Sequence, residues 1–513
     1  MPDILVVQMA RLGDFLQTTP LLCGIKEKCQ DNRVIVLIDS ANAEVAKKCG
    51  CVDEIICIDV DSILNEISDK SNAEEVFNII NKSCLSLLNR HFDDVINLNY
   101  SKIAAILSNM PESGRIYGYT LDSSRNRLSK DSWFVYFNNM IKHSPLSPFN
   151  LVDYFYFLYC KKKKVKKLSF NLIKSDHDKA DLIFNELNIG ADKKIISIHP
   201  GIRHEKRSWP IENYAEVISK YLENKNIEII LTGSAEERFL ADKLYSSISV
   251  IDEDKSRIHD LIGKTTISET AAVLNKSDML LCGDTGIMHL AAAVGVRILA
   301  LFIGPASVYN TGPYSEGDLV LQTNHDCGPC VEDMICSDVG CRYTITPEIV
   351  YNASQMILED SQDDISITSN IKFFRSKMDH WGVRYMPLNN PELDIKSLMN
   401  FCYREMGKKI ISSDYNFNTE DNQHYNNQES SLIDSEFING IITSGKVILN
   451  RAYIDTKWIS EDRLKSENSF WTPWIDSYLE NSKYETRNSC EYIYALETGL
   501  KLIDNYSSAD YEC

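Results

Sequence analysis

The segment from Asp278 to Ala293 constrains the fold more strongly than any other part of the chain. A short apolar run ends at Leu281, a turn of small and polar residues follows over 282–286 (Cys-Gly-Asp-Thr-Gly), and a run of small apolar residues comes next. A strand that enters a helix through such a turn presents free backbone amides, with partial positive charge, at the helix start. The segment therefore predicts an α/β fold with an anion-binding turn.

The residues of this turn fit a phosphorylated sugar. Thr285 and Gly286 let a ligand approach the backbone closely, and the carboxylate of Asp284 can accept hydrogen bonds from sugar hydroxyls. A second turn, Met9–Pro20, follows the apolar run Ile4–Val7 and also opens a helix. Two such turns suggest two nucleotide-binding halves that face each other across a cleft.

Length and composition are compatible with this arrangement. A chain of 513 residues with 44% hydrophobic residues has room for two domains with their own cores and an extension. The 54 Lys and Arg against 73 Asp and Glu give a net charge of −19, which argues against general nucleic-acid binding because a phosphate polyanion would be repelled.

Two features bear on the cellular compartment. No stretch is apolar enough to span a bilayer, and residues 1–7 lead directly into a strand with no basic region or cleavage site. The 15 cysteines, an odd number scattered through apparent strands and helices, fit a reducing compartment better than a disulfide framework. We therefore expect a cytoplasmic protein.

Residues 1–165 are predicted to form a first Rossmann-like domain. Short apolar runs alternate there with amphipathic segments, which is typical of a parallel sheet. The predicted strands are Ile4–Val7, Val34–Ile38, Glu54–Ile58 and Val95–Leu98. The lysine-rich run at 161–167 ends this domain, and we interpret it as a solvated interdomain linker rather than a membrane or phosphate patch.

A second α/β series, residues 166–358, is predicted to form the other Rossmann-like domain. Its expected strands and helices are Lys194–Ile198, Ile211–Leu222, Glu228–Leu231, Ala235–Tyr245, Ile267–Leu274, Met279–Leu281 and Ile298–Phe302. Residues 359–513 form an extension of unassigned role. It is predicted to be mainly helical, with a polar linker near 411–430.

Candidate catalytic residues lie in the first turn and after the first strand of the second domain. Gly13 and Asp14 open the first helix, and an aspartate there could act in the cleft or merely cap the helix. His199-Pro-Gly201 follows a strand, and Lys206 and Arg207 precede Trp209-Pro210, a typical helix start. Either cation could face the cleft or be a solvated surface charge.

Taken together, these motifs resemble glycosyltransferase family nine, the ADP-heptose:lipopolysaccharide heptosyltransferases. Their order and spacing match over about residues 1–355. The motifs that carry the resemblance are Arg11-Leu-Gly13-Asp14 with Thr18-Thr19-Pro20, His199-Pro-Gly201, Lys206 with Trp209-Pro210, Gly233-Ser-Ala-Glu236, and Asp284-Thr285-Gly286-Ile-Met-His289. Each motif alone is weak, so the specificity lies in the ensemble.

The resemblance implies a GT-B fold of two facing Rossmann-like domains and an inverting reaction. The second domain would hold the sugar nucleotide, and the first would face the acceptor. Asp14 resembles the family's general base. Lys206, with Arg207 as the alternative, resembles the cation that stabilises the departing diphosphate, so that catalysis needs no metal or other cofactor.

The resemblance also implies a set of donor-binding residues. Glu236 matches the carboxylate that holds the ribose, and Asp284, Thr285 and Gly286 match the loop for the sugar and phosphates. His289 is either a ligand contact or a packing histidine. The complete predicted donor set is Gly13, His199, Gly201, Glu236, Asp284, Thr285, Gly286 and His289.

Four cysteines in the loop 327–341 form a separate candidate site. Cys327, Cys330, Cys336 and Cys341 are close enough in sequence to bind a structural zinc or iron, and a pair separated by two residues forms the tight turn that such sites use. Four reduced thiols or a loop disulfide are the alternatives. None of these interpretations gives the loop a part in catalysis.

The sequence thus predicts a glycosyltransferase that moves a sugar, heptose from ADP-heptose by resemblance, to a hydroxyl acceptor. The acceptor is a glycan, a lipid-linked glycan or a protein in bacterial surface glycan or glycoprotein synthesis. A lipid-linked acceptor would bring the enzyme to the inner face of the inner membrane by peripheral contact. A 2-epimerase of the same fold and a non-catalytic sugar-nucleotide-binding scaffold remain the alternatives.

Overall fold

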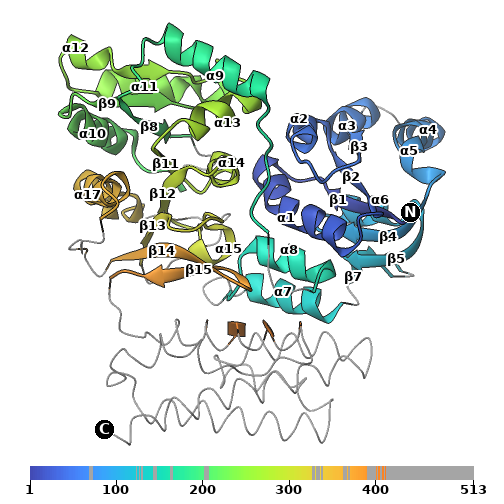
Figure 1. Cartoon of the computed structure of the whole chain (residues 1–513). Helices are drawn as coiled ribbons and strands as arrows, with labels where there is room; N and C mark the ends of the chain where they lie inside the picture. Colours follow the sequence, from blue (N-terminus) through green and yellow to red (C-terminus); the bar gives the residue numbers. More distant parts are fainter. Residues whose placement is uncertain are drawn as a thin grey trace, which may run out of the picture.

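The computed structural model describes residues 1–389 apart from several short segments, together with a few positions up to 411 (Figure 1). The segments not described are 69–72, 123, 126, 129–130, 143–146, 162–165, 202–206, 326–329, 331–335, 337–338, 362–366 and 368–369, and beyond 389 only 400, 403–404, 407–408 and 411 are described. The polar linker near 411–430 and the helices predicted after it therefore lie outside the described residues.

The first domain is built on a five-stranded parallel sheet of order β3-β2-β1-β4-β5. Its strands are β1 (Asp3–Gln8), β2 (Arg33–Asp39), β3 (Glu54–Ile58), β4 (His91–Asn97) and β5 (Glu112–Gly118). Helices cover both faces, which is why β1 and β2 are almost continuously apolar. These helices are α1 (Leu12–Lys28), α2 (Ala43–Lys47), α3 (Val60–Ser68), α4 (Ala73–Ser83), α5 (Leu85–Leu88), α6 (Lys102–Ser108), α7 (Ser132–Lys142) and α8 (Leu151–Tyr159).

The second domain contains an eight-stranded sheet of order β10-β9-β8-β11-β12-β13-β14-β15. The parallel strands are β8 (Lys194–His199), β9 (Ile227–Leu231), β10 (Ile258–Asp260), β11 (Met279–Gly283), β12 (Arg297–Phe302) and β13 (Leu319–Thr323). An antiparallel hairpin, β14 (Ile371–Asp379) and β15 (Gly382–Pro387), extends the sheet. The sheet therefore continues beyond residue 358, where we placed the end of this domain.

Helices also cover both faces of the second sheet. They are α9 (Lys174–Glu186), α10 (Ile211–Leu222), α11 (Arg238–Ser247), α12 (Asp252–Lys255), α13 (Ile267–Asn275), α14 (Gly286–Val294), α15 (Val308–Thr311), α16 (Cys341–Thr344) and α17 (Pro347–Leu358). Helix α14 ends at Gly295, whose φ of 83° lies in the left-handed region that glycine adopts without a steric penalty. The aromatic and aliphatic residues of α10 pack against β8 and β9 in one buried core.

The two domains meet along α1 and α14, which are in contact, and along α8, which touches β15 (Figure 1). One hydrophobic core runs through this junction and contains Phe15 and Leu16 of α1 with Met288 and Leu290 of α14. The observed architecture is the predicted pair of facing Rossmann-like domains. The start of each of these two helices lies at the junction, so the loops that precede them face the same space.

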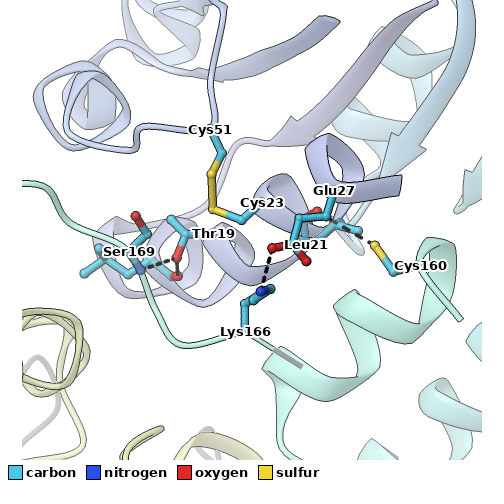
Figure 2. The surroundings of a disulfide bond; sticks show 9 residues. Thr19, Leu21, Cys23, Glu27, Cys51, Cys160, Lys166 and Ser169 are labelled. Atoms are coloured by element: carbon cyan, nitrogen blue, oxygen red, sulfur yellow. Dashed lines mark hydrogen bonds and ion pairs between the residues drawn. A yellow bond between two sulfur atoms is a disulfide. The ribbon is translucent and has the colours of Figure 1, made fainter. Parts of the chain in front are cut away.

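A disulfide joins Cys23 of α1 to Cys51 in the loop before β3 (Figure 2). We expected reduced cysteines, and for this pair that expectation is wrong in the structure. The two residues are separated by 28 positions in the sequence, and only the packing of α1 against the loop after α2 brings them together. Cysteine number and scatter contain no information about such a contact.

Candidate functional site

A cleft of about 700 Å³ lies between the two domains. It is at the carboxyl ends of β1, β8, β9 and β11, the edge at which parallel α/β sheets bind ligands. The first domain contributes Arg11, Leu12, Gly13, Asp14 and Gln17. The second contributes His199, Gly201, Arg207, Gly233, Ser234, Glu237, Thr265, Ile267, Thr270, Asp284, Thr285, Gly286, Ile287, His289 and Thr311.

Asp14 lies in the first turn of α1 and lines the cleft. Its Oδ2 accepts a hydrogen bond from the backbone N–H of Arg11 at 3.1 Å, so the carboxylate also caps the helix. Burial raises the pKa of Asp14 above its usual value, although the Arg11 N–H and charge act in the opposite direction. Both predicted roles of this residue are thus compatible with its position.

The threonines that follow Asp14 stabilise the helix at a proline. Pro20 lies inside α1 and has no N–H for the carbonyl of Leu16, and the hydroxyl of Thr19 donates to that carbonyl at 2.7 Å instead. The hydroxyl of Thr18 donates to the carbonyl of Asp14 at 2.8 Å. The Thr-Thr-Pro motif therefore keeps the helix continuous directly behind the candidate base.

A buried amide network supports the turn before Asp14. Asn99 Nδ2 donates to Gln8 Oε1 at 2.5 Å, and Asn99 Oδ1 accepts from the backbone N–H of Met9 at 2.6 Å. Gln8 Nε2 donates to Thr18 Oγ1 at 3.1 Å. No local sequence pattern indicates Asn99, because it lies 90 residues from the turn that it supports.

The starts of α1 and α14 approach each other so closely that a side chain at Gly13 would crowd the start of α14. A Cβ atom on Gly13 would lie 3.0 Å from Cδ2 of His289 and 3.2 Å from Cα of Gly286. Helix N-termini from both domains therefore open onto the cleft, and each presents unpaired backbone N–H groups there. This arrangement suits an anionic ligand bound between the domains.

Asp284 is held by two donors from its own domain. Its Oδ2 accepts from Arg207 Nη2 and from Thr311 Oγ1, the latter at 3.0 Å, and its side chain is only 8% exposed. Burial raises the pKa of Asp284, and the charge of Asp14 acts in the same direction, while Arg207 lowers it. Asp284 therefore orients Arg207 in the cleft. Lys206, which we favoured as the cation, lies outside the described residues.

The segment that carries Arg207 is anchored by the end of the cysteine loop. Trp209 is buried, and its Nε1 donates to the carbonyl of Ile345 at 2.7 Å. Arg342 Nε donates to the carbonyl of Ser208 at 2.9 Å. Loop residues just after Cys341 thus fix the position of the cation from outside the cleft.

Two polar atoms at the start of α14 are buried without a hydrogen-bond partner among the described residues. They are Oγ1 of Thr285 and Nδ1 of His289. Burial lowers the pKa of His289 to about 4, so the ring is neutral near pH 7. Buried polar groups are rarely left unpaired, so these atoms indicate a place for ligand oxygens or hydroxyls.

A carboxylate faces the other end of the cleft, but it belongs to Glu237 and not to Glu236. Glu236 is exposed and does not line the cleft. Glu237 Oε2 accepts from the backbone N–H of Ser234 at 2.7 Å, and its Oε1 lies 3.9 Å from His199 Nε2. A Cβ on Gly201 would lie 1.9 Å from Glu237 Oε1, which explains the glycine.

The cleft thus brings together most of the predicted site. Seven of the eight predicted donor residues line it, along with Asp14. Arg207 lies where Lys206 was expected, and Glu237 where Glu236 was expected. Sequence reasoning missed the contributions of Gln17, Thr265, Thr270 and Thr311, whose residue types carry no motif of their own.

The predicted cysteine loop is only partly described. Cys327 lies outside the described residues, Cys330 and Cys341 are half-buried, and Cys336 is exposed. A metal at this loop therefore stays a prediction. In the described part of the chain, the group of side chains with metal-ligand spacing is Cys23, Cys49 and Cys51, in the first domain.

No helix in the described ranges combines the length and the apolar character needed to cross a membrane.

Sequence comparison assigns the chain to a family. The family described as "Glycosyltransferase family 9 (heptosyltransferase)" matches residues 81–337. The chain belongs to this family. The match starts after Asp14, so the first turn of the cleft lies outside the matched residues and rests on its own geometry.

Two curated relatives of this chain are named as heptosyltransferases, and both match it at low identity. The "Lipooligosaccharide heptosyltransferase 2" of Campylobacter jejuni is 26% identical over 180 residues, which is 34% of this chain and 55% of the relative. The "Lipopolysaccharide heptosyltransferase 2" of Salmonella typhimurium is 25% identical over 142 residues, 28% of this chain and 40% of the relative. The chain thus spans about half the length of the curated relatives it matches.

Solved structures confirm the predicted GT-B fold. A family 9 glycosyltransferase from Veillonella parvula superposes with a TM-score of 0.57 at 19% identity, covering 70% of this chain and 98% of that one. The ADP-heptose lipopolysaccharide heptosyltransferase II of E. coli gives a TM-score of 0.50 at 16% identity, covering 70% and 100%.

Proposed function

We propose that this protein is an inverting glycosyltransferase that moves a sugar from a nucleoside diphosphate to a hydroxyl acceptor. The observation that carries the proposal is the cleft itself. Asp14 of the first domain lines this cleft together with Arg207 and the Asp284–Gly286 turn of the second. A base and an anion site on opposite walls are what a displacement at an anomeric carbon needs.

The second domain binds the donor in this proposal. The diphosphate lies at the start of α14, where the backbone N–H groups and the Thr285 hydroxyl donate to its oxygens. Arg207, oriented by Asp284, neutralises the charge that develops on the leaving diphosphate. Glu237 and the neighbouring His199 are placed to bind hydroxyls of the nucleoside.

The first domain supplies the base. Asp14 takes the proton of the acceptor hydroxyl as its oxygen attacks the anomeric carbon, and the bond to the diphosphate breaks on the opposite face. The raised pKa of Asp14 makes it a better proton acceptor than an exposed aspartate. Because Arg207 stabilises the leaving group, we infer that the transfer step needs no metal or other cofactor.

The names of the relatives support a heptose donor. The two curated relatives described above are heptosyltransferases by name, and the name of one structural neighbour includes ADP-heptose. We therefore propose heptose from ADP-heptose as the sugar, and a glycan, lipid-linked or protein hydroxyl of bacterial surface glycan or glycoprotein synthesis as the acceptor. The proposed place of action is the cytoplasm, at the inner face of the inner membrane when the acceptor is lipid-linked.

A product analysis tests this proposal. The full chain is incubated with ADP- and UDP-sugars, with and without a bacterial lysate as acceptor, and the products are identified by mass spectrometry. Sugar transfer that needs the lysate, and that Asp14→Asn abolishes, supports the proposal. Turnover of the donor without any acceptor would instead indicate a 2-epimerase, and binding without turnover would indicate a scaffold.

A further inference from the structure

Three cysteine sulfurs lie close together in the first domain, away from the cleft. Cys23 comes from the middle of α1, and Cys49 and Cys51 come from the loop between α2 and β3. The three Sγ atoms all lie within 4.8 Å of one another. Figure 2 shows the Cys23 and Cys51 side chains directed toward each other from these two elements.

The set contains sulfur donors and no carboxylate or imidazole from the described residues. Three thiolates select soft cations such as Zn²⁺ or Cu⁺ over Mg²⁺ or Ca²⁺, which prefer oxygen. In a tetrahedral zinc site with Zn–S bonds of about 2.3 Å, the sulfurs lie about 3.8 Å apart. The observed cluster is compatible with this spacing after small movements of the side chains.

The backbone around the cluster is fixed. Cys49 N–H donates to the carbonyl of Ala46 at 3.1 Å, and Val52 N–H donates to the carbonyl of Cys49 at 3.3 Å, so the loop is a closed turn. The Cys51 N–H and the Ser169 hydroxyl hydrogen bond with the Cys49 sulfur and lower its pKa, while burial has the larger opposite effect and raises it to about 11. Donors of this kind orient thiolate ligands in metal sites.

We propose that Cys23, Cys49 and Cys51 form a site for one thiophilic cation, Zn²⁺ or a cation of its class, and that the Cys23–Cys51 disulfide closes this site. The cation binds the reduced protein. Its three protein ligands come from α1 and the Cys49–Cys51 loop, and the fourth position is left for an exogenous ligand such as water.

The two states interconvert by balanced steps. A dithiol reduces the Cys23–Cys51 bond and is itself oxidised to a disulfide. The two protons that the dithiol loses end on the two protein thiols. Cation binding then releases one proton from each of the three thiols.

The site lies against the segment that joins the two domains. Ser169 N–H donates to Thr19 Oγ1 at 2.9 Å (Figure 2). Asn171 N–H donates to the carbonyl of Lys48 at 2.7 Å. A cation that fixes Cys23 and Cys49 therefore also fixes the surface on which residues 169–171 rest. Occupancy of the site should stabilise the interdomain connection without touching the cleft.

Metal content tests the proposal without reference to activity. Full-length protein is reduced with a phosphine, freed of it without oxygen, loaded with Zn²⁺, desalted and analysed for zinc. Cys51→Ser should hold one zinc per chain less than wild type, whereas Cys57→Ser, an exposed cysteine outside the cluster, should match wild type. Because the loop 327–341 is unchanged in all three proteins, its own zinc cancels in the comparison.

Two further measurements keep the test decisive if Cys51→Ser folds poorly. The first uses oxidised wild-type protein in which peptide mapping finds the Cys23–Cys51 disulfide and no other. This protein should hold one zinc per chain less than the reduced wild type. Ser169→Ala should keep the site but weaken Zn²⁺ binding, by about tenfold as for other supporting contacts. Equal zinc in oxidised and reduced protein, or in Cys51→Ser and Cys57→Ser, would overturn the proposal and leave a disulfide only.

Discussion

The two turns that face each other across the cleft share a topology but differ in how each treats its carboxylate. Asp14 accepts a hydrogen bond from the backbone N–H of Arg11, at the start of its own helix. Among the described residues, the cation that acts on its carboxylate is Arg11, through its charge. Asp284 is bound to both Arg207 and Thr311. In the proposed mechanism one carboxylate is therefore the proton acceptor, while the other positions a cation.

This difference shows how one kind of strand–turn–helix unit can serve two chemical purposes. In both turns the helix start offers N–H groups, so neither the topology nor the acidic residue decides the role. The role depends on what reaches the carboxylate from elsewhere in the domain. In the second domain, β8 is followed by the segment of Arg207, and β12 by the helix of Thr311.

The largest effect is expected from Asp14→Asn. General base catalysis contributes about 10²- to 10⁴-fold, so turnover should fall by that factor, while the dissociation constant of the donor should stay within about twofold. Asparagine can still cap α1, so the melting temperature should change little. Turnover measured by product formation and donor binding measured by calorimetry check this. Turnover near wild type would remove Asp14 from the mechanism.

The pH profile provides a control for this assignment. Asp14 must be ionised to accept a proton, and its pKa is raised by burial, so kcat/KM should fall as the pH falls through that raised pKa. The loss should begin at a higher pH than for an ordinary aspartate. The residual activity of Asp14→Asn should lack this acidic limb.

Arg207→Ala should have the next largest effect, because it removes the cation that Asp284 positions in the cleft. Loss of one charged donor to a leaving group costs about 10²- to 10³-fold in turnover, and donor affinity should fall as well. Lys206→Ala, the neighbouring charge, should cost much less. Steady-state kinetics and donor titration of both variants check the ranking. The reverse order would return the role to Lys206.

The comparison of Arg207 with Lys206 shows where sequence reasoning reaches its limit. The turns, the order of strands and the facing domains follow from local patterns of apolar, small and acidic residues. Which of two adjacent residues enters the cleft depends on the path of the backbone. Trp209 and its bond to Ile345 determine that path at Arg207, and this contact spans 136 residues.

The path of the backbone also explains why Glu237 lines the cleft instead of the predicted Glu236. The backbone N–H of Ser234 donates to the carboxylate of Glu237, three residues later, so the short 3-10 helix Ala235–Glu237 directs Glu237 back over Gly201 and leaves Glu236 exposed. A Ser-x-x-Glu pattern was present in the sequence and could have revealed this. The Cys23–Cys51 contact and the Asn99 network had no comparable local signal.

Gly13→Ala tests how closely the two turns must approach. The added carbon would be 3.2 Å from the backbone of Gly286 and 3.0 Å from His289, so the starts of α1 and α14 must separate by a few tenths of an ångström. Because the base and the donor site lie on different domains, we expect kcat/KM to fall by about tenfold.

Gly295→Ala is the control for this substitution. Its φ of 83° disfavours alanine, at a cost of about 1–2 kcal/mol, but nothing lies within 4 Å of the added carbon. It should lower the melting temperature and leave kcat/KM of the folded protein unchanged. If Gly13→Ala behaved like Gly295→Ala in both measurements, the close approach of the two turns would have no functional role.

The smallest effect is expected from Thr285→Val, which removes one hydroxyl from the anion-binding turn. Thr285 precedes α14 but makes no side-chain capping bond, and its buried Oγ1 has no partner in the described structure, so the free protein should lose no stability. Donor affinity should fall by about two- to tenfold, the value of one hydrogen bond.

Thr266→Val is the matched control, because Thr266 Oγ1 accepts from the Glu269 N–H at 3.2 Å and caps α13. It should cost about 1 kcal/mol of stability and leave donor affinity unchanged. Calorimetric titration with the nucleoside diphosphate and thermal unfolding of both variants separate the two cases. A loss of stability in Thr285→Val with unchanged donor affinity would mean that this hydroxyl serves the helix and that the second turn binds its anion through backbone groups and Arg207 alone.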